Sequence, residues 1–458
     1  MFDERLFVRL ERWEVALAEA ALRAPDRLPR DREAALRWAL GLARLRDGGG
    51  ADLLGRLERF RGDVVRTLTP VFENGVDLEA AALLAPVLAA RTASELKALA
   101  AVADRGAIEE EIRQKRLVLA LGGGGGSAWA HLGAFSLLEE EGLRPALLAG
   151  ASMGAVLALL RARSAIYDAG DALHAVRSLS LGRLLRPGAA PRAYGLPAPF
   201  RLCLREEVRW PGVDDLRLAD LPIPLVVTLS GVRRDGLPHP PSFYERLVPN
   251  ARLRPRILPR SLRALAEAAG ELVRARALVP IRVGGSRNTE LHPLDAVGYS
   301  CALPGVIQYE ATGSGLPHPL LDRVMEEHGV GWLLDGGLTE NVPARAAWEA
   351  VQEGAIGGRN ALILALDGFS PRLTSGLWMP LQRIAQENVR RSLEYAHAVV
   401  TYSRTLSPAD ILPSVNGLIR AIDLGRSQLA HQMPLIRKLT SPLPPLPNVA
   451  SARLRLAV

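Results

Sequence analysis

Apolar residues recur at helical spacing through roughly the first quarter of the chain. One face of the first expected helix carries apolar side chains every three or four residues, at Leu6, Leu10, Trp13 and Leu17. Stretches rich in proline, glycine or asparagine interrupt this pattern and favour loops at residues 25–29, 48–50 and 74–75. The pattern predicts a region of several helices, and no set of residues in it indicates a chemical function.

Short apolar runs alternate with helical stretches from residue 116 onward. The runs that we expect to be buried strands are residues 117–121, 146–149, 225–229, 332–334 and 361–366. The stretches that we expect to be helices are residues 128–141, 153–163, 261–276 and 344–352. This alternation indicates an α/β fold, in which helices cover both faces of a mainly parallel sheet.

The last part of the chain returns to a helical pattern. We expect helices over residues 378–404 and 415–439, and an extended surface segment over the proline-rich residues 441–447. The whole pattern predicts three consecutive parts: a helical N-terminal region at 1–112, an α/β domain at 113–375, and a helical C-terminal region with a proline-rich tail at 376–458.

Composition fits a folded globular protein and narrows the classes of partner. The chain has 458 residues, of which 48% are hydrophobic and 23% are charged. Its formal net charge is +8, which would suit an anionic surface as partner. The arginines alternate with acidic residues along the chain instead of forming a basic cluster, so we expect no nucleic-acid partner.

The cysteines, the N-terminal residues and the hydropathy of the chain indicate the cellular compartment in which we expect the protein. Cys203 and Cys301 have neither the spacing of a metal site nor that of a redox pair, which is consistent with a reducing cytoplasm. Charged residues follow soon after Met1, so we expect no cleaved signal peptide. No run of 18 or more apolar residues is free of charge, and any membrane contact is therefore expected to be peripheral.

The first motif with chemical meaning is the sequence GASMG, between an expected buried strand and an expected helix. Gly150 and Gly154 allow the backbone to turn sharply, and Ser152 between them would expose its hydroxyl at the helix N-terminus. The helix dipole and the free N–H groups at that end favour developing negative charge. A tight turn with an incidental serine is the alternative to the nucleophile that we predict.

The second motif is a run of five glycines, again between an expected strand and helix. Glycines at such a place let backbone N–H groups approach a ligand closely, as phosphate loops and oxyanion holes require. A phosphate loop fits less well because no lysine follows the glycines, and a flexible linker would interrupt the core unit. The predicted oxyanion donors are the amides of Gly123, Gly124, Gly125, Gly126 and Met153.

The third motif is DGG, which directly follows the expected strand at residues 332–334. Asp335 lies at the carboxyl end of that strand, and Gly336 and Gly337 open space beside it. Side chains at this edge of an α/β sheet commonly face the ligand site. The alternative for Asp335 is a helix cap or a turn.

A catalytic serine usually acts with a histidine that an aspartate orients. The histidines after Asp335 in the order Ser, Asp, His are His397 and His431, and both lie in expected helices without a loop or glycine context. We interpret them as ordinary surface or core residues. Asp335 is then the expected direct partner of Ser152.

These motifs, in this order, resemble those of the patatin-like phospholipase family. The resemblance spans residues 116–370 and also includes SCALPG at 300–305 and NVP at 341–343. It implies a three-layer fold and ester hydrolysis by a Ser152–Asp335 dyad without a catalytic histidine, metal or organic cofactor. The expected function is that of a lipid acyl hydrolase of the phospholipase A or lysophospholipase type, acting through an acyl-enzyme on a lipid ester.

One position departs from the family pattern. Family loops usually carry an arginine just after the glycines, where this chain has Gly126 or Ser127. The missing arginine predicts a preference for less charged esters or a slow reaction. The alternatives are an acyltransferase, a non-phospholipid esterase, or a degenerate member that binds lipid or a partner through its helical flanks. Intact Ser152, Asp335 and glycines argue against the degenerate member, whereas the dyad does not dictate which molecule accepts the acyl group.

Overall fold

Two compact units make up the chain in the computed structural model. The structure describes residues 3–48, 51–187, 194–196, 198, 200–208, 214–240, 271, 277–304, 306–311, 318–368, 388–403 and 405–447. Unit 1 comprises Met1–Arg116, Gly357–Leu362 and Gln432–Val458, and unit 2 comprises Leu117–Ile356 and Ile363–His431. The three consecutive domains expected from the sequence stay a prediction.

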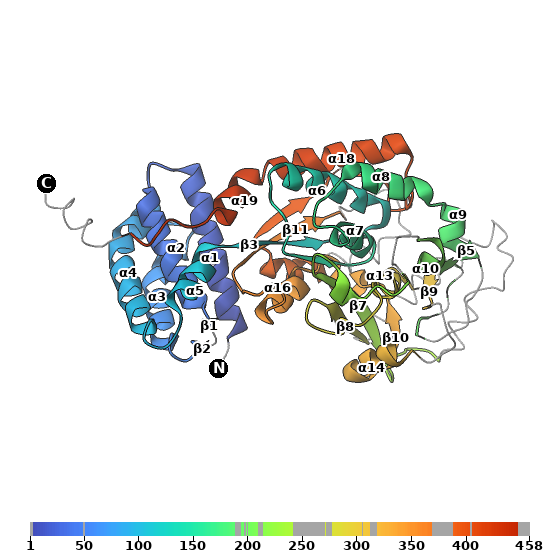
Figure 1. Ribbon diagram of the computed structural model, residues 1–458, viewed down its shortest axis with the longest axis horizontal. Coiled ribbons are helices and arrows are strands. Elements are labelled where there is room, and N and C mark those ends of the chain that lie inside the picture. The colour runs from blue at the N-terminus through green and yellow to red at the C-terminus, as the bar shows by residue number, and fades with distance from the viewer. Residues whose placement is uncertain are drawn as a thin grey trace. The chain divides into compact units, whose positions relative to one another are not determined.

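Unit 1 is built almost entirely of helices, as the apolar pattern predicts (Figure 1). Its helices are α1 (Glu4–Arg23), α2 (Arg30–Arg44), α3 (Glu58–Phe72), α4 (Leu78–Leu99), α5 (Arg105–Arg113) and α19 (Met433–Thr440). A two-stranded antiparallel sheet of β1 (Asp47–Gly48) and β2 (Ala51–Asp52) flanks the glycines where a loop was expected. Aspartate side chains accept hydrogen bonds from first-turn amides of three helices, at Asp3, Asp77 and Asp104.

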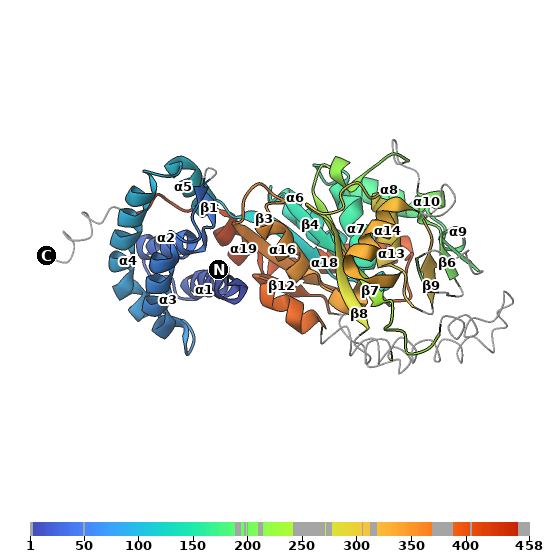
Figure 2. The same cartoon turned by 90° about the horizontal axis from the view of Figure 1, so that it is seen from below.

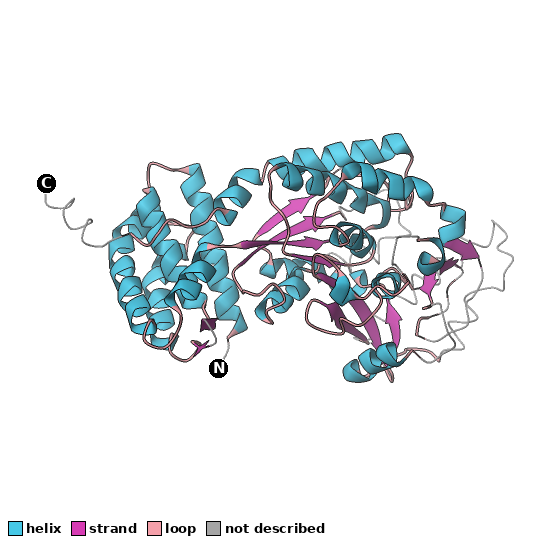
Figure 3. Ribbon diagram, in the orientation of Figure 1, coloured by secondary structure: helices cyan, strands magenta, loops and turns pink. Residues whose placement is uncertain are grey.

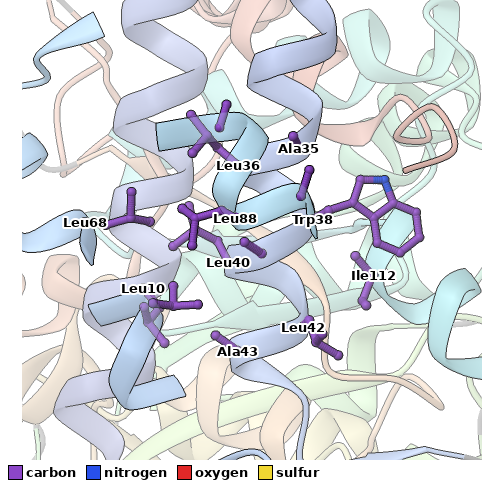
Figure 4. Packing of buried hydrophobic residues seen from close by; sticks show 14 of the residues in the cluster. Leu10, Ala35, Leu36, Trp38, Leu40, Leu42, Ala43, Leu68, Leu88 and Ile112 are labelled. Atoms are coloured by element: carbon purple, nitrogen blue, oxygen red, sulfur yellow. The ribbon is translucent and has the colours of Figure 1, made fainter. Parts of the chain in front are cut away.

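The core of unit 1 surrounds α2, whose side chains are buried along most of the helix. Leu36, Trp38 and Leu40 of α2 meet Leu88 of α4 and Ile112 of α5 in one apolar cluster (Figure 4). The buried side chains of α2 include charged ones such as Glu33 and Arg37, so the helix is enclosed and not merely covered on one apolar face. The neighbouring helices therefore fold around α2.

Unit 2 contains the central sheet, whose strand order is β10-β7-β4-β3-β11-β12, with β8 also paired to β7. The strands are β3 (Arg116–Leu121), β4 (Leu147–Gly150), β7 (Leu225–Arg233), β8 (Leu278–Gly284), β10 (Val330–Leu334), β11 (Ala361–Asp367) and β12 (Ala398–Thr401). Strand β4 runs parallel to β3 and β7, and β11 runs parallel to β12, whereas β8 and β10 are antiparallel to β7. The sheet is mixed and mainly parallel.

Helices cover both faces of this sheet (Figures 1 and 2). On one face lie α6 (His131–Glu140), α7 (Met153–Ala162) and α18 (Val415–Ala430), and on the other lies α16 (Ala344–Gln352). Strands β4 and β11 are buried along their whole length, as strands covered on both sides must be. The three-layer α/β fold is confirmed (Figure 3).

Smaller elements complete unit 2. The remaining helices of the described chain are η1 (Gly125–Ala130), α8 (Ala169–Ser178), α9 (Leu181–Leu184), α10 (Leu204–Glu207), η2 (Leu218–Asp220), α13 (Pro293–Ser300), α14 (Pro319–His328), α15 (Gly337–Glu340) and η3 (Leu393–Tyr395). A second sheet has the order β5-β6-β9, formed by β5 (Leu185–Pro187), β6 (Phe200–Leu202) and β9 (Ile307–Tyr309).

Two expectations for the C-terminal part hold only in part. Of the helix expected over residues 378–404, residues 378–387 lie outside the described residues and residues 388–392 are helical. Residues 398–401 form strand β12 instead, because a short apolar run with two valines can pair with β11 as well as continue a helix. The helix expected over residues 415–439 is broken between α18 and α19, where Pro434 stands in the first turn of α19. The helix expected at 261–276 lies outside the described residues, apart from residue 271.

No helix in the described part of the chain is long and apolar enough to cross a membrane.

Candidate active site

Ser152 occupies the sharp turn between β4 and α7. Its backbone has φ 51° and ψ −129°, a positive-φ conformation that is unfavourable for a residue with a side chain. A Cβ on Gly150 would lie 2.5 Å from the Cα of Ala155, and one on Gly154 would lie 2.3 Å from the carbonyl oxygen of Leu121. Both glycines are therefore required for the strand and helix to approach this closely, as predicted for the turn.

Asp335 lies beside this serine, at the carboxyl end of β10. The Ser152 hydroxyl donates a hydrogen bond to Oδ2 of Asp335 at 2.7 Å. The other carboxylate oxygen, Oδ1, accepts the N–H of Gly337 at 2.8 Å. A Cβ on Gly336 would lie 2.1 Å from the carbonyl oxygen of Thr228, so this glycine lets the DGG turn pack against β7. Two motifs 183 residues apart thus meet in one hydrogen bond.

The environment of Asp335 changes its acidity. Its side chain is only 6% exposed, and burial raises the pKa of the carboxyl to about 6. The hydrogen bonds from Ser152 and Gly337 oppose this shift because they favour the ionised form. A carboxyl with a pKa near 6 can accept a proton from a hydroxyl and release it again near neutral pH.

The glycine loop lies against the serine turn. A Cβ on Gly123 would stand 2.9 Å from the Cβ of Ser152. Gly124 and Gly125 have φ values of 130° and 58°, which favour glycine. The amides of Gly123 and Gly126 already donate to the carbonyl oxygens of Asn341 and Pro408, each at 3.1 Å. Within the described residues, the amides of Gly124, Gly125 and Met153 have no hydrogen-bond partner.

This geometry narrows the predicted set of oxyanion donors. An amide that already donates within the protein cannot donate to a ligand at full strength, which argues against Gly123 and Gly126. The free amides are those of Gly124, Gly125 and, at the start of α7, Met153.

A model of the patatin-like phospholipase family matches residues 119–348, half of the 458-residue chain. The chain belongs to this family. The match includes the glycine loop, the serine turn and the DGG turn, so the three motifs that meet in space all lie in the patatin domain. Members of the family are lipid acyl hydrolases. A search among curated proteins found no match to this chain.

Other side chains of the patatin domain hold the serine turn and were missed as site residues from the sequence. The amide of Ser152 donates to Oγ of Ser300 at 2.8 Å, and that hydroxyl donates to the carbonyl oxygen of Thr228 at 2.7 Å. Oγ of Ser230 donates to the carbonyl oxygen of Asp335 at 2.7 Å. The SCALPG segment, which contains Ser300, was the sequence signal that could have indicated this contact.

Cys301 directly follows Ser300, and burial together with the Asp335 charge raises the pKa of its thiol.

The histidines of the patatin domain and its C-terminal continuation have other roles. Nδ1 of His397 accepts the N–H of Ile363 at 2.8 Å, and His431 is exposed at the end of α18. His131 is fully buried, and its Nε2 bonds the carbonyl oxygen of Gly122 at 2.9 Å. Burial lowers the pKa of His131 to about 4, so the ring is neutral. In the described chain, no histidine hydrogen-bonds to Ser152 or Asp335.

Ser127 stands at the corner where family loops usually carry arginine. It is buried, and its hydroxyl donates to the carbonyl oxygen of Gly124 at 2.7 Å. The corner is therefore closed by a short hydrogen bond within the loop. Among the described residues, no group of three or more His, Cys, Asp or Glu side chains could hold a metal ion.

Proposed function

We propose that this member of the patatin-like family is a lipid acyl hydrolase of the phospholipase A or lysophospholipase type, with Ser152 as nucleophile and Asp335 as its base. The observation that carries the proposal is the 2.7 Å hydrogen bond from the Ser152 hydroxyl to the buried Asp335 carboxylate. A nucleophile needs a base within hydrogen-bond reach, and here that base is a carboxylate.

The first half of the reaction makes an acyl-enzyme. Asp335 takes the proton of Ser152 as the serine oxygen attacks the acyl carbonyl of the lipid. The resulting tetrahedral oxyanion accepts hydrogen bonds from the free amides of Gly124, Gly125 and Met153. Asp335 then gives its proton to the leaving alcohol, the carbon–oxygen bond of the ester breaks, and the acyl group stays on Ser152.

The second half releases the fatty acid. Asp335, ionised again, takes a proton from water as the water attacks the acyl-serine carbonyl. The same amides hold the second oxyanion, and the proton passes from Asp335 to Ser152 as the acyl group leaves. The positive end of α7, which begins directly after Ser152, favours negative charge in both steps.

Turnover of two variants tests this assignment. Ser152→Ala and Asp335→Asn should each lower kcat for a p-nitrophenyl ester, and for fatty-acid release from phosphatidylcholine vesicles, by about 10³-fold or more. Ser136→Ala is a matched control, because Ser136 on α6 donates to the carbonyl oxygen of Leu132 and contacts Tyr167, away from the dyad. Full activity of either dyad variant would contradict the proposal.

The lipid substrate implies contact with a membrane surface, and this contact is peripheral in our proposal. Flotation with phosphatidylcholine vesicles measures it, and Ser152→Ala should float as wild type does because the serine is needed for chemistry and not for adsorption. Flotation without any fatty-acid release by wild type would favour a lipid-binding protein. Transfer of the acyl group to an added alcohol in preference to water would indicate an acyltransferase.

A further inference from the structure

A turn formed by residues 407–411 contacts the glycine loop, although it lies well beyond the part of the chain that matches the family, residues 119–348. The amide of Gly126 donates to the carbonyl oxygen of Pro408 at 3.1 Å. Nε1 of Trp129, in the 3-10 helix that follows the glycines, donates to the carbonyl oxygen of Ile411 at 3.1 Å. Both ends of the turn therefore hold the segment that leads from the glycine loop into α6.

Three carbonyl groups of the turn approach the glycines too closely for any side chain. A Cβ on Gly125 would lie 2.1 Å from the carbonyl oxygen of Pro408. A Cβ on Gly126 would lie 2.4 Å from the carbonyl oxygens of both Ser407 and Asp410. Contacts this close leave the two glycines little freedom to move relative to the turn.

The turn also decides which amides of the loop stay free. It occupies the amide of Gly126, and the adjacent amides of Gly124 and Gly125 are left without partners in the described structure. We propose that the 407–411 turn is a positioning element of the active site, which orients the glycine loop so that Gly124 and Gly125 donate to the oxyanion. This inference rests on the proposed hydrolase function.

Hydrogen bonds within the turn hold its shape, and substitutions that remove them can test its role. Oδ2 of Asp410 accepts the amide of Ser407 at 3.1 Å, and the amide of Asp410 donates to the carbonyl oxygen of Ser407 at 2.9 Å. Oγ of Ser407 accepts the amide of Ala409 at 3.3 Å. Residues 407–410 are exposed, so changing the Asp410 side chain leaves the core intact.

Two variants loosen the turn from opposite ends. Asp410→Ala removes the acceptor that closes the turn, and Trp129→Phe removes the indole donor to Ile411 while keeping an aromatic ring. Removing one oxyanion donor typically lowers kcat by 10²–10³-fold, so a displaced loop should lower kcat by about tenfold or more in each variant. The KM for the p-nitrophenyl ester should stay within about twofold of wild type, because the ground-state carbonyl depends less on these amides.

A trifluoromethyl ketone gives a second readout, because its tetrahedral serine adduct requires the oxyanion donors. Its inhibition constant should rise in both variants, in parallel with the loss of kcat. Asp410→Asn keeps an oxygen acceptor at the same place and should restore both kcat and inhibition. Gln428→Ala is the control for α18, because the Gln428 side chain pairs with Ser403 at the surface, and the change should leave both readouts unchanged.

The outcomes separate this inference from the function on which it rests. If Ser152→Ala is inactive but Asp410→Ala, Trp129→Phe and the double variant keep wild-type kcat and inhibition, the turn has no positioning role. A lower melting temperature with unchanged kcat would likewise contradict the inference and leave a purely structural turn. If Ser152→Ala retains full activity, the proposed function itself is wrong.

Discussion

Burial of the Asp335 carboxylate lowers the stability of the folded protein but makes the carboxylate a stronger base. This carboxylate is buried next to Leu334 and Leu338 of an apolar cluster, and within the described part of the chain only Ser152 and Gly337 donate hydrogen bonds to it. Burial raises its pKa to about 6, which is unfavourable for the folded state at neutral pH because the charge is poorly solvated there. The same shift makes the carboxylate a stronger base toward Ser152.

The pH dependence of activity should follow this pKa. Because the proposed base acts only when ionised, kcat/KM for a p-nitrophenyl ester should be half-maximal near pH 6 and fall about tenfold per unit below it. Initial rates between pH 4.5 and 8, with Ser152→Ala as the background, measure this profile. A flat profile across that interval would contradict the role of Asp335 as base.

Asp335→Asn should make the protein more stable at neutral pH while removing activity. The folded-state pKa of about 6 lies above the ordinary 3.8, so the free energy of unfolding falls as the pH rises through that interval. Replacing the carboxylate by an amide removes this loss, and the gain should be about 3 kcal/mol at pH 7.5 and well under 1 kcal/mol at pH 4. Urea unfolding at the two pH values checks it, and a variant less stable than wild type at pH 7.5 would refute it.

Some residues of the site could be found in the sequence and others could not. Ser152 and Asp335 stand in short motifs with glycines whose steric purpose is local, and the structure brings the two side chains together. Ser300 accepts the amide of Ser152, and the carbonyl oxygen of Asn341 accepts the amide of Gly123. Both contacts join residues far apart in sequence, and no local pattern indicates them. The amide of Gly126 is occupied because it donates to the carbonyl oxygen of Pro408, and no sequence motif connects Pro408 to the glycine loop.

At the level of elements, α18 packs closely against α6 and the end of η1. A Cβ on Gly425 of α18 would lie 1.9 Å from the carbonyl oxygen of Ala130, and one on Gly133 of α6 would lie 2.0 Å from that of Ile422. Two glycines therefore allow these helices to approach to backbone contact. This crossing supports α6 and, through it, the end of the glycine loop.

Gly425→Ala tests how much this crossing contributes. The added methyl group cannot fit without moving α18, and the expected loss of stability is about 2–3 kcal/mol. Gly182→Ala in α9 is the matched control, because a Cβ there meets nothing within 4 Å. Urea unfolding compares the two variants. If Gly425→Ala is as stable as wild type, the close approach of α18 to α6 contributes little to the free energy of unfolding.

Periodicity predicted the elements well where the element is long or fully buried, as for α16, β3 and β11. It failed at β12, because four residues are too few to show a period and pairing with β11 decides their conformation. The sequence also could not indicate that α18 would pack on α6, because the two glycines involved are nearly 300 residues apart and each is unremarkable in its own helix.

At the scale of the whole molecule, segments distant in sequence assemble around Glu14 in unit 1. Oε1 of Glu14 lies 3.1 Å from Nε of Arg37, and Oε2 lies 2.5 Å from Arg44 and 2.9 Å from Lys115. All four side chains are nearly inaccessible to solvent. Burial alone would raise the pKa of Glu14, but Lys115, Arg44 and Arg37 hold it well below its usual value. Apolar spacing in the first helix gave no sign of this network.

Glu14→Gln should destabilise the protein strongly. It leaves three buried cations without the carboxylate that they share, and the expected loss is about 3–5 kcal/mol. Glu19→Gln is the control, since Glu19 on the same helix pairs with Arg23 at the surface. Urea unfolding at pH 7 measures both, and a loss below 1 kcal/mol for Glu14→Gln would show that the network contributes little.

The central claim is that Ser152 is an activated nucleophile, and a fluorophosphonate probe tests it most directly because labelling requires no knowledge of the lipid. Peptide mapping by mass spectrometry should find the probe on Ser152 in wild type, no labelling in Ser152→Ala, and much slower labelling in Asp335→Asn. Labelling at another serine, or none in a preparation that hydrolyses esters, would contradict the account.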